Sequence, residues 1–110
     1  MVEYSLSLDS IFSALSDPTR RAILQQVSSN ELSVGQIAKH YDLTFAAVSK
    51  HLKVLERAKL IIKRRRGKQQ MVHLAPQSLE PAAQFIEIYR AMWESRFDAL
   101  EQYLNETKEN

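Results

Sequence analysis

Residues 31–74 constrain the fold more than any other part of the chain, because they combine two short capped helices with a basic hairpin. Ser33 and Gln36 fit a capping box, the exchange of hydrogen bonds that begins many helices. Thr44 can cap a second helix in the same way after a short turn. The pattern predicts a helix–turn–helix unit over residues 33–58.

The second helix has one apolar stripe and one polar face. Its residues Val48, Leu52 and Leu55 recur at spacings of four and three, so they are expected to face the core. That orientation exposes small and hydrogen-bonding side chains in the first half of the helix, and such side chains can approach base edges closely. The candidates for base contact are Phe45, Ala46, Ser49 and Lys50.

A basic β-hairpin, or wing, is predicted over residues 60–74. Two apolar runs form its strands, and Gly67 supplies the backbone freedom that a hairpin tip needs. The basic residues 63–68 are expected at the tip, where they can meet phosphates or place one arginine in a narrow minor groove. The candidates for phosphate or wing contact are Thr44, His51, Lys53, Arg57, Arg64, Arg65, Arg66, Lys68 and Gln69, with Gln70 either in contact or simply strand surface.

Charge is distributed unevenly along the chain. Residues 44–74 carry nine Lys or Arg residues and one acid, a formal charge of +8, whereas the rest of the chain carries −6. Such asymmetry points to a surface that binds a polyanion. A solvated charged surface is the simpler alternative, and it ranks second because the charge falls on one structural unit.

One long helix is predicted over residues 79–106, with Pro81 tolerated in its first turn. Its apolar stripe is longer than a small domain can cover, so we expect it to pair with a second copy, assisted by a helix over residues 5–16. The alternative is that it folds back on its own domain. The candidate dimer-interface residues are Leu8, Ile11, Phe12, Phe85, Tyr89, Met92, Trp93, Phe97, Leu100 and Leu104.

These elements predict one mostly α-helical domain over residues 1–110, with a helix–turn–helix, a small β-hairpin and a long C-terminal dimerisation helix. The N-terminus has no signal-peptide pattern and no apolar run is long enough to span a bilayer, so we expect a cytoplasmic protein without membrane partners.

Several classes of site are not expected. The 110-residue chain has no cysteine, and His40, His51 and His73 show no paired metal-ligand spacing, so we predict neither a metal site nor a cofactor. The glutamates that recur every seven residues from Glu80 suit the wet face of a helix better than acid–base chemistry. Without a glycine-rich phosphate loop or a nucleophile–base pair, an enzyme is not expected.

The order of these motifs resembles the ArsR/SmtB family of winged helix–turn–helix repressors. The runs that carry the resemblance are ALSDPTRRAIL at residues 14–24, ELSVGQIA at residues 31–38 and AVSKHLKVL at residues 47–55. The resemblance implies a homodimer that represses transcription. It also implies that the recognition helix spans residues 44–58 and that the wing spans residues 60–74.

The chain departs from that family's metal-sensing members. Many members bind metal through cysteines at positions that look like Ser33 and Gly35 here, and the last helix has no histidine for the family's other metal site. Residues 93–104 resemble a metal-independent branch that includes the sporulation-delay autorepressor and repressors encoded beside START-like proteins. This resemblance implies an autoregulatory repressor without a metal signal; the sequence does not identify an inducer.

The leading hypothesis is therefore a homodimeric repressor that binds double-stranded operator DNA sequence-specifically. One alternative is a winged-helix protein-interaction module whose wing meets an acidic partner. Another is a repressor released by a partner protein or by a small hydrophobic ligand near Tyr89, Trp93 and Phe97.

Overall fold

The computed structural model describes the backbone of residues 2–109 and the side chains of residues 8–75, 77 and 79–108. It has the predicted fold class, mostly helical with a small antiparallel sheet. Residues 1 and 110 of the predicted domain lie outside the described residues. The elements, in chain order, are α1 (Val2–Leu15), α2 (Pro18–Ser29), β1 (Leu32–Ser33), α3 (Val34–Tyr41), α4 (Phe45–Arg57), β2 (Ile61–Arg66), β3 (Gln69–Leu74), a 3-10 turn η1 (Pro76–Leu79) and α5 (Glu80–Glu109).

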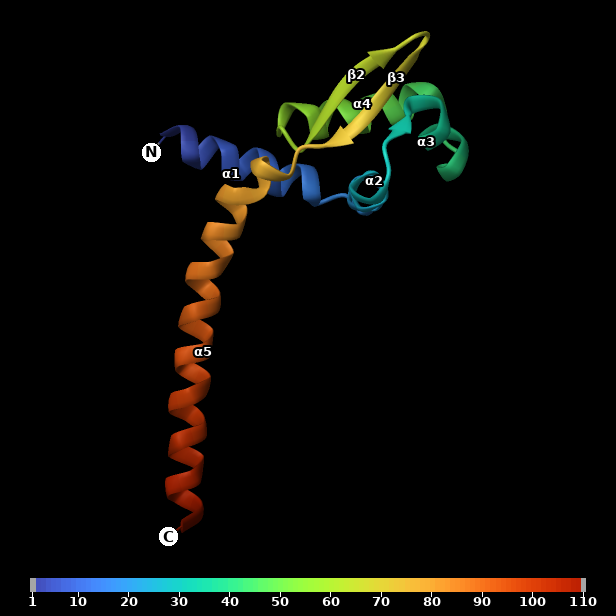
Figure 1. Cartoon of the computed structure of the whole chain (residues 1–110). Helices are drawn as coiled ribbons and strands as arrows, with labels where there is room; N and C mark the ends of the chain where they lie inside the picture. The colour runs from blue at the N-terminus through green and yellow to red at the C-terminus, as the bar shows by residue number, and fades with distance from the viewer. Residues whose placement is uncertain (1, 110) are drawn as a thin grey trace.

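The molecule consists of a packed head and a projecting helix (Figure 1). Elements α1 to β3 form the head, and α1 lies across the first turns of α5. The rest of α5 extends away from the head as a single rod, so the molecule measures 72 × 33 × 20 Å. At about 1.5 Å per residue, α5 alone is about 45 Å long.

One apolar core holds the head together. Its largest fully buried side chains include Ile23 from α2, Ile37 from α3, Leu52 from α4 and Val72 from β3. Ile11 of α1 is also fully buried in this core. In one protomer Ile11 therefore packs against its own domain, while its assignment to a dimer interface stays a prediction.

The helix starts follow from side chains that cap free backbone amides. Asp17 accepts hydrogen bonds from the amides of Thr19 (2.7 Å) and Arg20 (3.1 Å). The Ser33 hydroxyl accepts from the Gln36 amide at 3.1 Å, and the Gln36 side chain accepts from the Ser33 amide at 2.9 Å. This exchange confirms the predicted capping box, and each cap satisfies amides that the first helical turn leaves unpaired.

Both helices of the helix–turn–helix end in the same way. Asp42 follows α3 with φ 52°, and Lys59 follows α4 with φ 62°, both in the left-handed region. The amide of Leu60 donates to the Leu55 carbonyl at 3.0 Å and that of Lys59 to the Glu56 carbonyl at 2.9 Å. This pair of bonds is a Schellman motif, which terminates α4 and turns the chain into β2.

The sheet has three antiparallel strands in the order β1-β3-β2. The sequence predicted β2 and β3 but missed β1, a two-residue strand that pairs Leu32 with Val72. The hairpin is also longer than expected, since Arg66 pairs with Gln69 and only Gly67 and Lys68 form the loop. Most of the basic run predicted at the tip therefore lies along β2, whose backbone is held by pairing with β3.

The cap on α2 gives a pH-dependent prediction. The hydrogen bond from the Arg20 amide lowers the pKa of the Asp17 carboxyl below its usual value. A lowered pKa means that the cap stabilises the fold fully above the usual aspartate range and loses this effect as pH falls through the native pKa. We therefore expect Asp17→Ala to lower the melting temperature at pH 7 and to differ less from wild type near pH 3.

Thermal denaturation followed by circular dichroism across pH 3–8 would measure this effect. Asp9→Ala, an exposed substitution on α1, is the matched control and should change the melting temperature little. An Asp17→Ala deficit that stayed constant across that range would contradict the cap's role.

Candidate nucleic-acid interface

Helix α4 presents the residues predicted to contact bases. Its stripe of Val48, Leu52 and Leu55 is completely buried, as the spacing predicted. The opposite face is open at its beginning, where Phe45 retains 62% of its surface. Of the other candidates, Ala46 and Lys50 are exposed and Ser49 is half-buried. The helix is thus anchored along one side and leaves an apolar and hydrogen-bonding surface on the other.

Phe45, the first residue of α4, and the hairpin tip line one depression in the surface. The start of α3, the loop residue Lys68 and the first residues of β3 complete its lining. A groove of this kind brings the aromatic ring of α4 and a positively charged tip into one continuous surface. The lining residues are Ser33, Val34, Gly35, Phe45, Lys68, Gln69 and Gln70.

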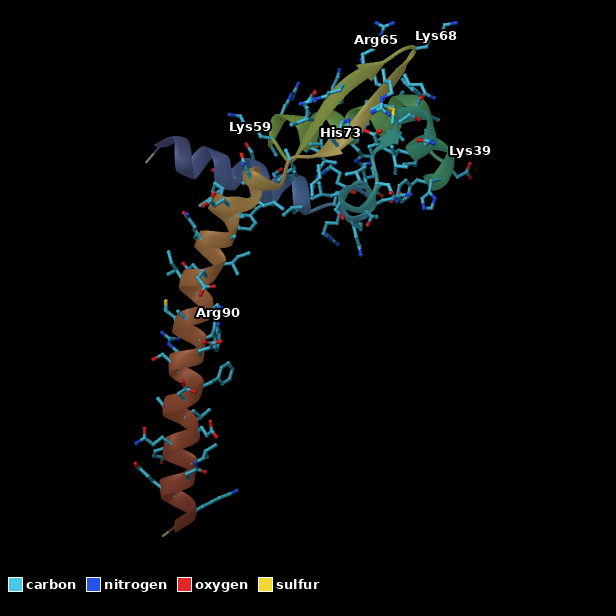
Figure 2. All side chains as sticks on the ribbon, viewed as in Figure 1. Lys39, Lys59, Arg65, Lys68, His73 and Arg90 are labelled. Carbon is cyan, nitrogen blue, oxygen red and sulfur yellow. The ribbon has the colours of Figure 1, made fainter. Side chains whose placement is uncertain are left out.

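The tip of the wing carries exposed cations. Arg65 and Lys68 lie at the end of the hairpin that is farthest from α5 (Figure 2). The Arg65 Nε donates to the Gly67 carbonyl at 3.1 Å, and Gly67 has φ 61°. A glycine with positive φ in the first position of a two-residue loop is typical of a type II′ hairpin turn. Arg64, one residue earlier, is exposed as well.

Two of the basic side chains in β2 are already paired with acids. Lys63 Nζ lies 3.6 Å from a carboxylate oxygen of Glu56 on α4. Arg66 Nη1 lies 2.6 Å from Glu31 Oε1, and His73 Nε2 lies 3.1 Å from Glu31 Oε2. The positive charge of the wing is therefore less freely available than the sequence indicated.

The remaining phosphate candidates lie on α4. Thr44 is exposed, but its hydroxyl accepts a hydrogen bond from the Ala47 amide at 3.0 Å and so has a structural role. Lys53 and Arg57 are exposed along the second half of the helix. His51 is half-buried, and its charge contributes to lowering the pKa of the Asp17 carboxyl. These cations extend the positive surface along α4.

The described residues hold no group of three or more histidine, cysteine or acidic side chains that could bind a metal ion. His40 packs edge-to-face on Tyr41, with ring centroids 4.8 Å apart, and His73 meets Glu31. Burial raises the pKa of the Tyr41 hydroxyl. None of the described helices is long and apolar enough to cross a membrane.

Helix α5 separates an apolar face from an acidic one. Phe85 is half-buried, with its ring centroid 5.8 Å from that of Phe12 on α1. Beyond this contact the apolar side chains of α5 are open to solvent and keep 44–64% of their surface. They are Ile86, Ile88, Tyr89, Met92, Trp93, Phe97, Leu100, Tyr103 and Leu104.

The acidic face of α5 is organised by Arg90. This guanidinium pairs with Glu94 and, at 2.5 Å, with Glu87. Its hydrogen bond lowers the pKa of the Glu87 carboxyl, and Glu87 in turn raises the pKa of Arg90. The Arg90–Glu94 pair supports the interpretation of the glutamate heptad as a solvated face.

Glu31 contacts the candidate interface but was not among the residues predicted from the sequence. It contacts Arg66, which is 35 positions later in the chain. No local pattern could have identified it, because the contact depends on how β1 joins β3. The only available signal was an acidic residue directly before a segment of strongly positive charge.

This fold and surface are those of a winged helix–turn–helix regulator, and comparison with known proteins agrees. Residues 17–63 match the family model described as bacterial regulatory protein, arsR family. The transcriptional repressor SdpR of Bacillus subtilis is 37% identical over 60 residues, which cover 54% of this chain and 67% of that protein. The regulator Rv2034 of Mycobacterium tuberculosis is 40% identical over 73 residues, 66% of this chain and 68% of that protein.

The chain belongs to the ArsR family of bacterial regulatory proteins. The predicted resemblance is thus confirmed, and so is the expectation that the protein is a transcriptional regulator rather than an enzyme.

Solved structures share the fold. An ArsR-like regulator from Rhodococcus sp. RHA1 has a TM-score of 0.72 at 28% identity, covering 89% of this chain and 92% of that one. HlyU from Vibrio cholerae N16961 has a TM-score of 0.64 at 28% identity, covering 83% and 97%. A homodimeric winged helix–turn–helix DNA-binding domain from Mycobacterium bovis has a TM-score of 0.63 at 24% identity, covering 80% of each chain, and shows the fold alone.

Proposed function

We propose that the protein is a homodimeric repressor that binds double-stranded DNA sequence-specifically, regulates its own operon and needs no metal signal. The observation that carries the DNA-binding part is the shared groove between Phe45 on α4 and Lys68 on the wing. The major groove admits an α-helix, and a basic hairpin beside that helix can neutralise the flanking phosphates. A helix that exposes both apolar and hydrogen-bonding groups suits base edges better than an acidic protein surface.

The base-contact assignments follow from chemistry along α4. Phe45 and Ala46 offer apolar contact for a thymine methyl group, whereas Lys50 offers a donor to the acceptor edge of guanine. Ser49 can donate or accept at either type of pair. These roles fit the distribution of charge along α4. The first turn is uncharged, which suits apolar contact with bases, whereas Lys53 and Arg57 come later in the helix, where they can meet DNA phosphates.

The wing assignment predicts a sequence-independent loss. We expect Arg64→Ala combined with Arg65→Ala to weaken binding to every duplex and to lower the slope of log affinity against log salt by about two. Fluorescence anisotropy at several salt concentrations, on the protein's own upstream region and on a scrambled duplex, would measure both. Lys108→Ala, at the far end of α5, is the control and should leave the slope unchanged. Unaltered binding by the double variant would remove the wing from the interface.

The recognition-helix assignment predicts a change of preference instead. Lys50→Ala should lose about 1–3 kcal/mol of discrimination at one guanine position while binding to scrambled duplexes changes less. Selection from a randomised duplex library, compared with wild type, would show the position affected. A uniform loss on all sequences would instead reassign Lys50 to the phosphate backbone.

Dimerisation is proposed from the exposed apolar face of α5. Nine large apolar side chains on one helix form a surface that a soluble monomer rarely leaves open. The Mycobacterium bovis domain with the same fold is a homodimer. Paired α5 helices would set two recognition helices on half-sites about 34–36 Å apart, one turn of duplex DNA.

Leu100→Glu tests this interface. Leu100 keeps 51% of its surface in the protomer, so a carboxylate there should not disturb the head. In a dimer it would be buried without a partner, and we expect the dissociation constant to rise by about 100-fold or more. Sedimentation velocity at micromolar concentration would show this, with Glu101→Gln on the acidic face as the control. A wild-type monomer at that concentration would contradict the proposal.

Independence from metal is supported by the chemistry of two positions. Ser33 and Gly35 stand where metal-binding relatives are expected to carry cysteines, and the Ser33 hydroxyl already serves the capping box of α3. Autoregulation rests on the resemblance of residues 93–104 to the metal-independent branch. A gel shift with the protein's own upstream region, with and without zinc, tests both parts together.

One observation favours a second candidate, a repressor released by a small hydrophobic ligand. Tyr89, Met92, Trp93 and Arg96 line a shallow apolar hollow on α5. Because this hollow lies on the face proposed for dimerisation, a ligand there would act by changing how two copies meet. The protein-interaction alternative has no comparable feature in its favour.

A further inference from the structure

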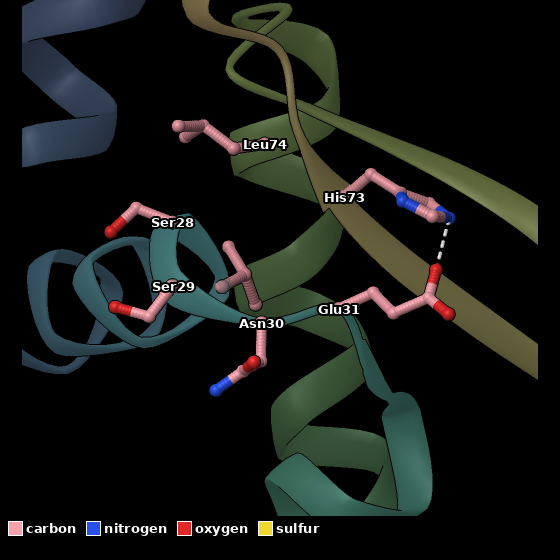
Figure 3. Close-up of a pocket in the computed structure, with 7 residues that line it drawn as sticks. Ser28, Ser29, Asn30, Glu31, His73 and Leu74 are labelled. Atoms are coloured by element: carbon pink, nitrogen blue, oxygen red, sulfur yellow. Dashed lines mark ion pairs between the residues drawn. The ribbon is translucent and has the colours of Figure 1, made fainter.

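Glu31 sits where an arginine and a histidine of the wing converge. It directly precedes β1, and its carboxylate faces His73 on β3 (Figure 3). One carboxylate oxygen lies 3.1 Å from His73 Nε2, and the other lies 2.6 Å from Arg66 Nη1. Both oxygens of a single acid are thus engaged by residues of the hairpin, one of which, Arg66, is a candidate for phosphate contact.

The contact with Glu31 directs Arg66 away from the tip. Arg66 is the last residue of β2, next to the loop, whereas β1 pairs with Met71 and Val72 farther along β3. To reach Glu31, the guanidinium must fold back from the tip toward the base of the hairpin. Arg66 nevertheless keeps 67% of its side-chain surface, so it is free to leave.

We propose that Glu31 is a positioning residue that holds Arg66 in the free protein and that a DNA phosphate displaces it on binding. The inference rests on the proposed function, because it concerns how Arg66 exchanges the Glu31 carboxylate for a DNA phosphate. Exposed ion pairs contribute little to stability, so the exchange is accessible at low cost. While the pair is intact, Arg66 and Glu31 together add no net charge to the wing. The pair therefore limits the attraction of the wing to any duplex.

The Glu31 carboxylate keeps a neighbour after Arg66 leaves. His73 Nε2 lies 3.1 Å from one of its carboxylate oxygens, and His73 is held in place by β3. The pairing register places Arg64 and Arg66 of β2 on the same face as His73. The end of α2 contributes the uncharged Val27, Ser28, Ser29 and Asn30 to the same hollow.

The test is a double-mutant cycle on DNA affinity. Glu31→Gln keeps the shape of the side chain but removes its charge, so it should tighten binding to a mixed-sequence 30-base-pair duplex by about threefold to tenfold at low salt, with a steeper salt dependence. In an Arg66→Gln background the same substitution should change affinity by less than about twofold, because its target is gone. Fluorescence anisotropy at fixed pH provides all four affinities.

Glu56 provides a matched control. It is a second acid beside the wing, but it pairs with Lys63 at 3.6 Å. Glu56→Gln removes the same charge, and any gain in affinity should be the same with or without Arg66→Gln. Glu31→Asp, which keeps the charge on a shorter side chain, should bind with an affinity between wild type and Glu31→Gln. Melting curves for each variant check that the fold is intact.

The outcomes distinguish a failure of the proposed DNA binding from a failure of the proposed exchange at Arg66. If wild type binds no duplex at any pH, the proposed function fails. If wild type binds but Glu31→Gln binds more weakly, or if its gain persists without Arg66, the displacement of Glu31 is wrong while the interface stands.

Discussion

The burial of one stripe of α4 is the constraint on which the rest of the head depends. Val48, Leu52 and Leu55 are fully buried, so the helix cannot rotate about its axis without exposing part of the core. Protein interiors are close-packed, and a rotated helix would lose both contacts and apolar burial. Fixing one side of α4 fixes the other, and thereby sets which side chains stand beside the wing.

Where short-range chemistry decides the structure, the sequence was sufficient to predict it. A capping serine and its glutamine partner are three residues apart, and the apolar stripe of α4 lies within two helical turns. The two apolar runs on either side of Gly67 likewise predicted a hairpin. The fold class and the family followed from such local signals together. The assignment of Phe45, Ser49 and Lys50 to bases stays a prediction, since it concerns a partner molecule.

What the sequence could not show depends on distant segments coming together. Strand β1 has two residues and exists because β3 offers it a partner, so no propensity marks it. The burial of Ile11 in the head was not expected, because an apolar residue at helical spacing fits a core and a dimer equally well. The Glu31–Arg66 contact likewise requires the relative positions of β1 and β2, which no local window contains. The run of charges therefore overstated how many cations of the wing are unpaired.

The residue in the left-handed conformation after α4 links the conformational stability of the domain to its positive charge. Glycine adopts that conformation without the steric cost that a side chain incurs, which is of the order of 1 kcal/mol. Lys59 occupies the position instead, directly after the last turn of α4, so its positive charge lies toward the negative end of the helix dipole. The domain thus keeps a conformationally costly residue that is also a cation. Selection for thermal resistance alone would favour glycine there, whereas selection for attraction to a polyanion would retain lysine.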